Sequence, residues 1–199
     1  MKKNLIIGKE REFCVNMLVL MGKSASGKDT LRDILVKKHG FHSVVTYTSR
    51  PMRKGEIADV TYHYISKEEF LEKIKSGFFA EWKKFLVDDD VWYYGSAKED
   101  IEKADEKSVI ILTPDGVRDI KKNGIKGTVI YLYANLTTIR TRLKNRKDTN
   151  DRAEDRIERD LRNFKGAENL ANKIVYNNTE DKLENIVNNV LSYYKEVNK

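Results

Sequence analysis

The chain has 199 residues, enough for one domain with a sizeable hydrophobic core. Hydrophobic residues make up 40% of the chain and charged residues 35%, which indicates a globular protein with a heavily charged surface. The formal net charge of +7 permits an anionic partner, but acidic residues are interspersed and no Lys/Arg block dominates, so a solvated basic surface explains it equally well.

The N-terminal residues 1–12 are expected to form a loose lead-in. The apolar run Leu5-Ile6-Ile7 is too short for a signal-peptide core, and no apolar run approaches the roughly 20 residues that span a bilayer. The only cysteine, Cys14, cannot form an internal disulfide. We therefore expect a cytoplasmic protein with neither a membrane nor a nucleic-acid partner.

A glycine-rich stretch follows the apolar run 15–21 and precedes a helical pattern that ends at Gly40. Strand, glycine-rich turn, lysine and helix is the order of a P-loop, whose backbone amides cradle phosphates. Lys28 adds a positive charge for the outer phosphates. The residues expected to bind ATP here are Gly22, Ser24, Ala25, Ser26, Gly27, Lys28, Asp29 and Thr30.

The position after the P-loop lysine departs from the usual pattern. A Ser or Thr hydroxyl normally holds Mg²⁺ there, whereas this chain has Asp29 followed by Thr30. Either Asp29 faces the metal with support from Thr30, or Asp29 points away and stabilises the start of the helix. The second alternative is slightly favoured, and Asp29 or Thr30 is the candidate Mg²⁺ ligand.

A strand is expected from Val44, followed by a loop at Pro51 and Gly55. Arg50 and Arg53 could hold one phosphate between two guanidinium groups, or they could be scattered surface charge. Ser66 and Glu69 form a capping box, which predicts a helix that stops at Gly77.

Two further strands are expected at residues 78–82 and 91–96. The three aspartates 88–90 between them are interpreted as a solvated turn rather than a metal site.

The apolar runs 108–112 and 128–133 fit strands buried on both faces of a parallel sheet. Helices are expected at 114–122 and 136–146, a last strand at 174–176 and a final helix from Leu183. With right-handed crossovers these elements predict a doubly wound α/β core.

Within residues 146–165, a flexible entry at 148–151 is expected to precede a helix. That helix has an apolar stripe of Ile157, Leu161 and Phe164, and three arginines on the opposite face: Arg152, Arg156 and Arg159. Such a helix is either a solvated face or an arginine-bearing lid over phosphates.

Taken together, the P-loop, the segment Arg50-x-x-Arg53-x-Gly55-Glu56, Tyr62, Glu81 and the segment Tyr93-Tyr94-Gly95-Ser96 resemble guanylate kinase. The resemblance runs from about Met17 to the C-terminal helix. It implies an α/β fold: a P-loop NTPase three-layer core with a parallel sheet (13–45, 99–145 and 161–199), an inserted nucleoside-monophosphate-binding lobe (46–98) and a short lid (146–160).

The resemblance also implies Mg²⁺-dependent phosphoryl transfer from ATP to GMP or dGMP. Its motifs assign the acceptor phosphate to Arg50, Arg53, Tyr62 and Tyr94, the guanine edge to Thr46, Glu81 and Ser96 beside Gly95, and the ordering of that site to Glu56. They assign the transferred phosphoryl group to Lys28, Arg146 and Arg156, with Arg152 or Arg159 as alternatives, and the approach to adenine to Asn177. A monomer and a homodimer both stay open.

One position departs from the resemblance. Thr113 stands where the family usually has an aspartate near guanine and the metal, and Asp115 could compensate. A nucleoside monophosphate kinase is therefore indicated more firmly than a GMP kinase. The alternatives are a non-catalytic guanylate-kinase-like binding module and a kinase of the same fold with a different acceptor.

Overall fold

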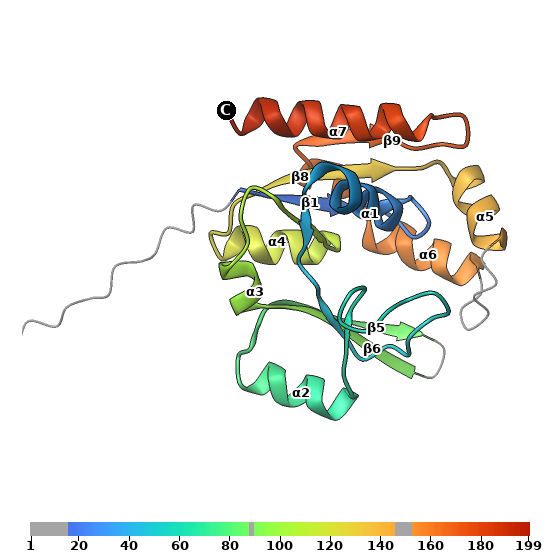
Figure 1. Cartoon of the computed structure of the whole chain (residues 1–199). Helices are drawn as coiled ribbons and strands as arrows, with labels where there is room; N and C mark the ends of the chain where they lie inside the picture. Colours follow the sequence, from blue (N-terminus) through green and yellow to red (C-terminus); the bar gives the residue numbers. More distant parts are fainter. Residues whose placement is uncertain (1–15, 88–89, 146–152) are drawn as a thin grey trace, which may run out of the picture.

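A five-stranded parallel sheet forms the centre of the computed structural model, which describes residues 16–87, 90–145 and 153–199 (Figure 1). Its strand order is β2 (His42–Ser43), β7 (Ser108–Ile111), β1 (Met17–Met21), β8 (Gly127–Tyr133) and β9 (Lys173–Tyr176). All four neighbouring pairs are parallel. The predicted doubly wound α/β core is confirmed.

Helices cover both faces of this sheet because its strands are apolar on both sides. Leu18 and Leu20 of β1 pack in one cluster with α1 (Lys28–His39) and α7 (Leu183–Val197). The alternate β1 residues Met17, Val19 and Met21 pack in a second cluster, together with residues of α3 (Lys98–Glu102) and α4 (Pro114–Lys122). This alternation of side chains produces the three layers.

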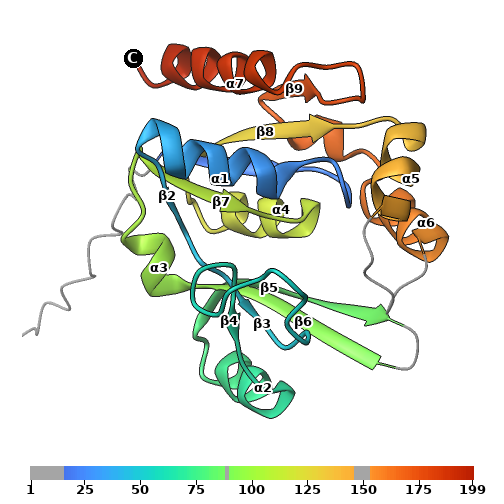
Figure 2. The same ribbon diagram turned by 45° about the vertical axis from the view of Figure 1, so that its right-hand side comes forward.

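A second, four-stranded sheet lies beside the first (Figure 2). Its order is β4 (His63–Tyr64), β3 (Tyr47–Thr48), β6 (Asp90–Ala97) and β5 (Phe79–Val87). The helix α2 (Lys67–Lys75) packs on it through Phe70, whose ring stacks on Phe79 with centroids 4.4 Å apart. Ser66 Oγ accepts a hydrogen bond from Glu69 N, as the capping box predicts.

The strand expected to start at Val44 is not formed there, because β2 ends at Ser43 and β3 begins at Tyr47. β2 pairs with β7 in the larger sheet, whereas β3 pairs with β4 and β6 in the smaller one. The residues between them carry the chain from one sheet to the other, so β propensity alone could not locate the boundary. Of the predicted aspartate turn, residues 88 and 89 lie outside the described residues, and Asp90 begins β6.

Between β8 and β9 the described chain forms two helices, α5 (Leu136–Asn145) and α6 (Ala153–Asn163). The short 3₁₀ helix η1 (Ala167–Leu170) follows α6. The predicted apolar stripe is confirmed for Ile157 and Phe164, which are buried, and wrong for Leu161, which is 46% exposed. The predicted opposite face is wrong for Arg156, which is only 7% exposed. Burial of α6 therefore follows its packing partners and not hydrophobicity alone. None of the helices in the described ranges is long and apolar enough to cross a membrane.

Candidate functional site

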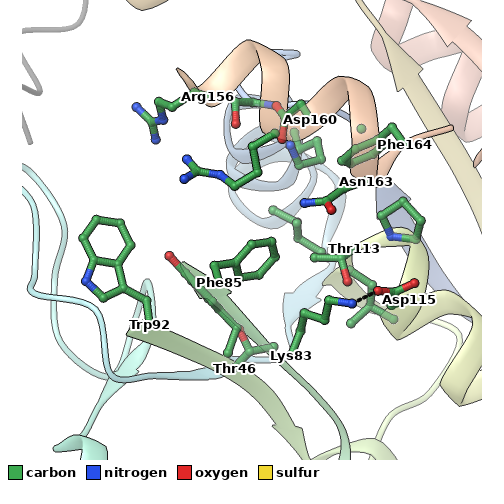
Figure 3. Close-up of a pocket in the computed structure, with 18 of the residues that line it drawn as sticks. Thr46, Lys83, Phe85, Trp92, Thr113, Asp115, Arg156, Asp160, Asn163 and Phe164 are labelled. Atoms are coloured by element: carbon green, nitrogen blue, oxygen red, sulfur yellow. Dashed lines mark hydrogen bonds and ion pairs between the residues drawn. The ribbon is translucent and has the colours of Figure 1, made fainter. Parts of the chain in front are cut away.

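A cavity of about 220 Å³ lies between the P-loop, α6 and the strands β5 and β6 (Figure 3). Residues expected to bind ATP and residues expected to bind the acceptor nucleotide both line it. From the P-loop and α1 come Gly22, Ser24, Ala25, Lys28 and Asp29; from the second sheet and its loops come Thr46, Arg53, Tyr62, Glu81, Tyr94 and Gly95. Two groups of residues with different expected ligands thus share one cavity.

Two side chains from outside the P-loop hold it in place: Asn177, which follows β9, and Arg142 of α5. Asn177 Nδ2 donates to Ser26 O at 2.7 Å, and Arg142 Nη1 donates to Ala25 O at 3.2 Å. Gly27 has a φ of +98°, and a Cβ added there would lie 2.3 Å from Asn177 Nδ2. The loop conformation therefore needs glycine at this position both for its dihedral angle and for space.

Asn177 and Arg142 also bond to each other, because Arg142 Nη2 donates to Asn177 Oδ1 at 3.1 Å. Asn177 is buried and does not line the cavity, so its expected approach to adenine stays a prediction. Sequence reasoning missed Arg142. An arginine in the last turn of a helix is common, and no spacing distinguished this one.

Asp29 and Thr30 differ in where they lie. Asp29 lines the cavity, and its Oδ1 accepts a hydrogen bond from Arg32 Nη1 at 3.3 Å. Thr30 is exposed and does not line the cavity. Asp29 sits in the first turn of α1, where a carboxylate interacts favourably with the helix dipole, yet it also reaches the cavity. Of the two candidate Mg²⁺ ligands, Asp29 has the fitting position.

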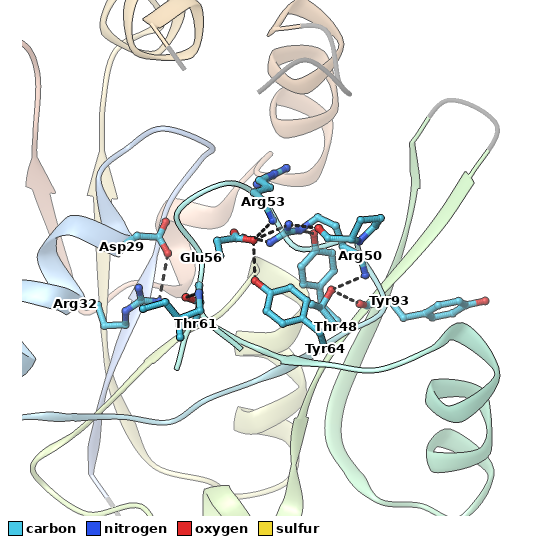
Figure 4. Close-up of polar contacts among 12 residues, drawn as sticks. Asp29, Arg32, Thr48, Arg50, Arg53, Glu56, Thr61, Tyr64 and Tyr93 are labelled. Atoms are coloured by element: carbon cyan, nitrogen blue, oxygen red, sulfur yellow. Dashed lines mark hydrogen bonds and ion pairs between the residues drawn. The ribbon is translucent and has the colours of Figure 1, made fainter. Parts of the chain in front are cut away.

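Arg50 is the centre of a buried polar network (Figure 4). Its guanidinium donates to both oxygens of Glu56, with Nη2–Oε1 at 2.8 Å and Nη1–Oε2 at 3.0 Å. Arg50 Nε donates to Tyr94 Oη at 3.1 Å, and Tyr64 Oη donates to Glu56 Oε2 at 2.7 Å. The same carboxyl oxygen accepts from Arg53 N at 2.7 Å. Arg50 is only 2% exposed, which rules out scattered surface charge for this residue.

The network decides the ionisation of its members. Burial raises the pKa of Glu56, but the hydrogen bonds from Arg50, Arg53 N and Tyr64 outweigh it and the pKa is lowered. Burial likewise lowers the pKa of Arg50, and the bond to Glu56 more than reverses this. Both groups are therefore charged, and Glu56 fixes the Arg50 guanidinium beside the Tyr94 hydroxyl.

A second carboxyl group lies at the other end of the second sheet. Glu81 is 8% exposed, and Ser96 Oγ donates to its Oε1 at 2.6 Å. Burial raises the pKa of Glu81 to about 7, with the charge of Asp119 adding to the rise. The first turn of α4 packs closely against the Glu81 carboxyl group, since a Cβ at Gly116 would lie 2.8 Å from Glu81 Oε2.

Thr113 and Asp115 both lie at the start of α4. Thr113 Oγ1 accepts a hydrogen bond from Gly116 N at 3.1 Å and so caps the helix. Asp115 pairs with Lys83 of β5 and, at 2.6 Å, with Arg118. Burial raises the pKa of Asp115, but these two cations outweigh it and the pKa is lowered. Sequence reasoning missed Lys83, although it lies two residues from Glu81 on the same strand face.

The remaining candidates are distributed as follows. Arg156 and Arg159 line the cavity, whereas Arg146 and Arg152 lie outside the described residues. Ser96, Arg50 and Glu56 stand behind the lining residues that they contact. The lining residues Phe85, Trp92, Asp160 and Asn163 had no role in the sequence-based hypothesis.

Comparison with known proteins gives a consistent result. The family model described as guanylate kinase matches residues 15–195. A guanylate kinase of Wolinella succinogenes is 40% identical over 112 residues, which cover 54% of this chain and 50% of that protein. A guanylate kinase of Schizosaccharomyces pombe is 30% identical over 142 residues, covering 68% of each chain.

The match to the first of these relatives thus spans about half of that relative's length. Among solved structures, a guanylate kinase from Anaplasma phagocytophilum superposes with a TM-score of 0.65 at 17% identity. That alignment covers 92% of this chain and 86% of the other, and it supports the same fold.

Proposed function

The chain belongs to the guanylate kinase family, and on this premise we propose that it transfers the γ-phosphoryl group of ATP to GMP or dGMP. The observation that carries the proposal is the single cavity lined both by the P-loop and by Arg53, Tyr62, Glu81 and Tyr94. Phosphoryl transfer needs two nucleotides with their phosphates in line, and one shared cavity meets that need.

In this proposal the P-loop amides and Lys28 hold the phosphates of ATP. The acceptor phosphate is bound by Arg53, Tyr62 and Tyr94, which line the cavity. Arg50, which the sequence motif also assigned to this phosphate, supports the Tyr94 hydroxyl from behind and is itself held by Glu56. An oxygen of the acceptor phosphate attacks the γ-phosphorus, and the bond from that phosphorus to the β,γ-bridging oxygen breaks, which leaves ADP. Lys28 and Arg156 neutralise charge on the group in transfer.

Mg²⁺ bound with ATP would neutralise further charge on the phosphates. The oxygen ligand that fits it is the Asp29 carboxylate, because Mg²⁺ prefers oxygen ligands and Asp29 lines the cavity beside Lys28. Thr30 lacks this position.

The base of the acceptor is proposed to lie against Glu81, Ser96 and Thr46. An ionised Glu81 carboxylate accepts hydrogen bonds from the N1–H and N2–H donors of guanine, and adenine lacks that pair of donors. Ser96 Oγ fixes one oxygen of this carboxyl group at 2.6 Å. The base contact thus selects the acceptor, while the phosphate contacts serve any nucleoside monophosphate.

We assign the smaller sheet and its loops, residues 46–98, to the acceptor-binding lobe, and residues 13–45, 99–145 and 161–199 to the core. The lid, residues 146–160, includes 146–152, which lie outside the described residues. Arg146 keeps its proposed role in phosphoryl transfer on the sequence resemblance alone. A cytoplasmic location, and a monomeric or homodimeric state, stay predictions.

A coupled ADP-release assay with GMP, dGMP, AMP, UMP and CMP tests the proposal. We expect GMP and dGMP to be preferred. Lys28→Met should lower kcat/KM at least about 100-fold, because it removes a charge on the phosphates. The matched control is Lys37→Met in the last turn of α1, where the side chain is exposed and activity should be retained.

The two alternatives predict different results in the same assay. A binding module without catalysis gives no turnover with any acceptor. A kinase of the same fold with another acceptor gives its highest kcat/KM with AMP, UMP or CMP. Either result would contradict the proposed reaction.

A further inference from the structure

Helix α6 contacts the P-loop through a carboxylate. Asp160 Oδ2 accepts a hydrogen bond from Ser24 N at 2.6 Å, although the two residues are 136 positions apart. One turn earlier, Ile157 packs in a buried cluster that includes Ala25 of the same loop. A polar and an apolar contact on one face of α6 thus hold two successive P-loop residues.

The hydrogen bond from Ser24 N to Asp160 Oδ2 is short, at 2.6 Å. An ionised acceptor shortens and strengthens a hydrogen bond from a backbone amide. The contact also uses the limb of the loop next to β1, while the amides at the N-terminus of α1, from Lys28 onward, lie on the other limb. The amides from Lys28 onward are not used by this contact and can hold phosphates, whereas the amide of Ser24, which was also expected to bind ATP, donates to Asp160.

The contact fixes the rotation of α6 about its axis. Arg156 is one turn before Asp160 and Arg159 is adjacent to it, and all three line the cavity (Figure 3). Arg159 Nη1 also donates to Leu86 O of β5 at 3.3 Å. Described residues of α6 therefore reach from the P-loop to the second sheet, and rotating the helix would displace both arginines.

We propose that Asp160 is a positioning residue, which docks α6 on Ser24 N and thereby sets Arg156 and Arg159 at the phosphoryl-transfer site. The proposal rests on the proposed kinase reaction. Asp160 acts through the arginines and not on the substrate, so its loss should affect turnover more than nucleotide binding.

The test compares Asp160→Ala and Asp160→Asn with the wild-type enzyme. Asp160→Ala should lower kcat by about 10- to 100-fold, since a displacement of about 1 Å can cost that much, while the Kd of ATP changes less than about threefold. Asp160→Asn should recover most of the loss, because its amide oxygen can accept the same bond. The control is Glu158→Ala, whose side chain is exposed on the same helix and pairs with Arg162.

Hydrogen exchange of residues 153–163 in the nucleotide-free protein gives a second reading that needs no activity. Exchange should be faster in Asp160→Ala than in the wild type and in Glu158→Ala. Unchanged exchange, or an unchanged kcat, would overturn the docking role. ATP binding about tenfold tighter in Asp160→Ala would also overturn it, because the carboxylate would then be competing with phosphate. Failure of the kinase proposal is seen separately, as a wild-type enzyme without turnover.

Discussion

Glu81 is the residue in which burial and the proposed role oppose each other. Its carboxyl group must be ionised to accept two hydrogen bonds from guanine, but burial raises its pKa from 4.5 to about 7. A neutral Glu81 loses one acceptor. GMP should therefore bind with release of a proton near neutral pH.

The KM for GMP should rise as the pH falls below about 7, because Glu81 becomes protonated, and the KM for ATP should stay level. Glu81→Gln removes this pH dependence and lowers kcat/KM for GMP at pH 8 by about 100-fold or more. Steady-state kinetics from pH 5.5 to 8.5 measure both effects. Equal turnover of GMP by the variant would refute the base-reading role.

Glu81→Gln, which should lower activity, should raise the stability of the folded protein above neutral pH. The folded protein binds the Glu81 proton more tightly than the unfolded chain, so between pH 4.5 and about 7 this group makes the folded state less stable as the pH rises. Glu81→Gln carries no charge to bury. Its free energy of unfolding at pH 8 should exceed that of the wild type by up to about 3 kcal/mol, as measured by urea denaturation at pH 5 and pH 8.

At the scale of elements, the sites are set by how helices begin. The P-loop is closed by Gly27 at the start of α1, and the wall beside Glu81 is made by α4, which Thr113 caps. Helix α2 supports the second sheet and begins at a Ser66 cap. The caps at Thr113 and Ser66 therefore stabilise elements that surround the site, while Gly27 belongs to the P-loop itself.

Ser66→Ala should destabilise the protein by about 1 kcal/mol, because Ser66 Oγ accepts the hydrogen bond of Glu69 N at 3.0 Å. Kinetic constants should stay unchanged, since α2 does not line the cavity. Ser76→Ala is the matched control at the other end of α2: there the hydroxyl donates to Lys73 O, and its loss should cost less than half as much. Equal losses from the two variants would contradict the capping role.

In the molecule as a whole, the second sheet contacts the core through β5 and helix α4, on the side of the cavity where Glu81 lies. Lys83 of β5 pairs with Asp115 in the first turn of α4, and Asn123 Nδ2 donates to Ala80 O at 3.1 Å. The Lys83 and Asp115 side chains are 37% and 40% exposed, so solvent screens their pair. The pair should therefore contribute little to stability, although it links β5 to α4.

A double-mutant cycle with Lys83→Met and Asp115→Asn should give a coupling energy below about 1 kcal/mol in the free energy of unfolding. The coupling should shrink further in 0.5 M NaCl. The same cycle on Lys103 and Glu99 serves as a control. These two side chains are exposed, lie four residues apart and connect no separate elements. A coupling of several kcal/mol would mean that the pair holds the two sheets together.

The parallel core and the P-loop could be predicted from the amino-acid sequence, because both depend on local patterns. Runs of apolar residues need burial on two faces, and a glycine-rich turn between a strand and a helix leaves few conformations. The arginine and tyrosine motifs likewise identified much of the cavity wall that the second sheet and its loops contribute, since Arg53, Tyr62, Glu81 and Tyr94 line it.

Tertiary structure alone decided which side chains face the cavity from α6. Periodicity favoured Leu161 for the interior, but that position is 46% exposed and Arg156 is buried. A polar group inside a fold needs a hydrogen-bond partner, and the partner of the half-buried Asp160 is a backbone amide 136 residues away. The sequence did not indicate Arg142 or Lys83 for the same reason. Their partners, Asn177 and Asp115, are distant in sequence, and only folding brings each pair together.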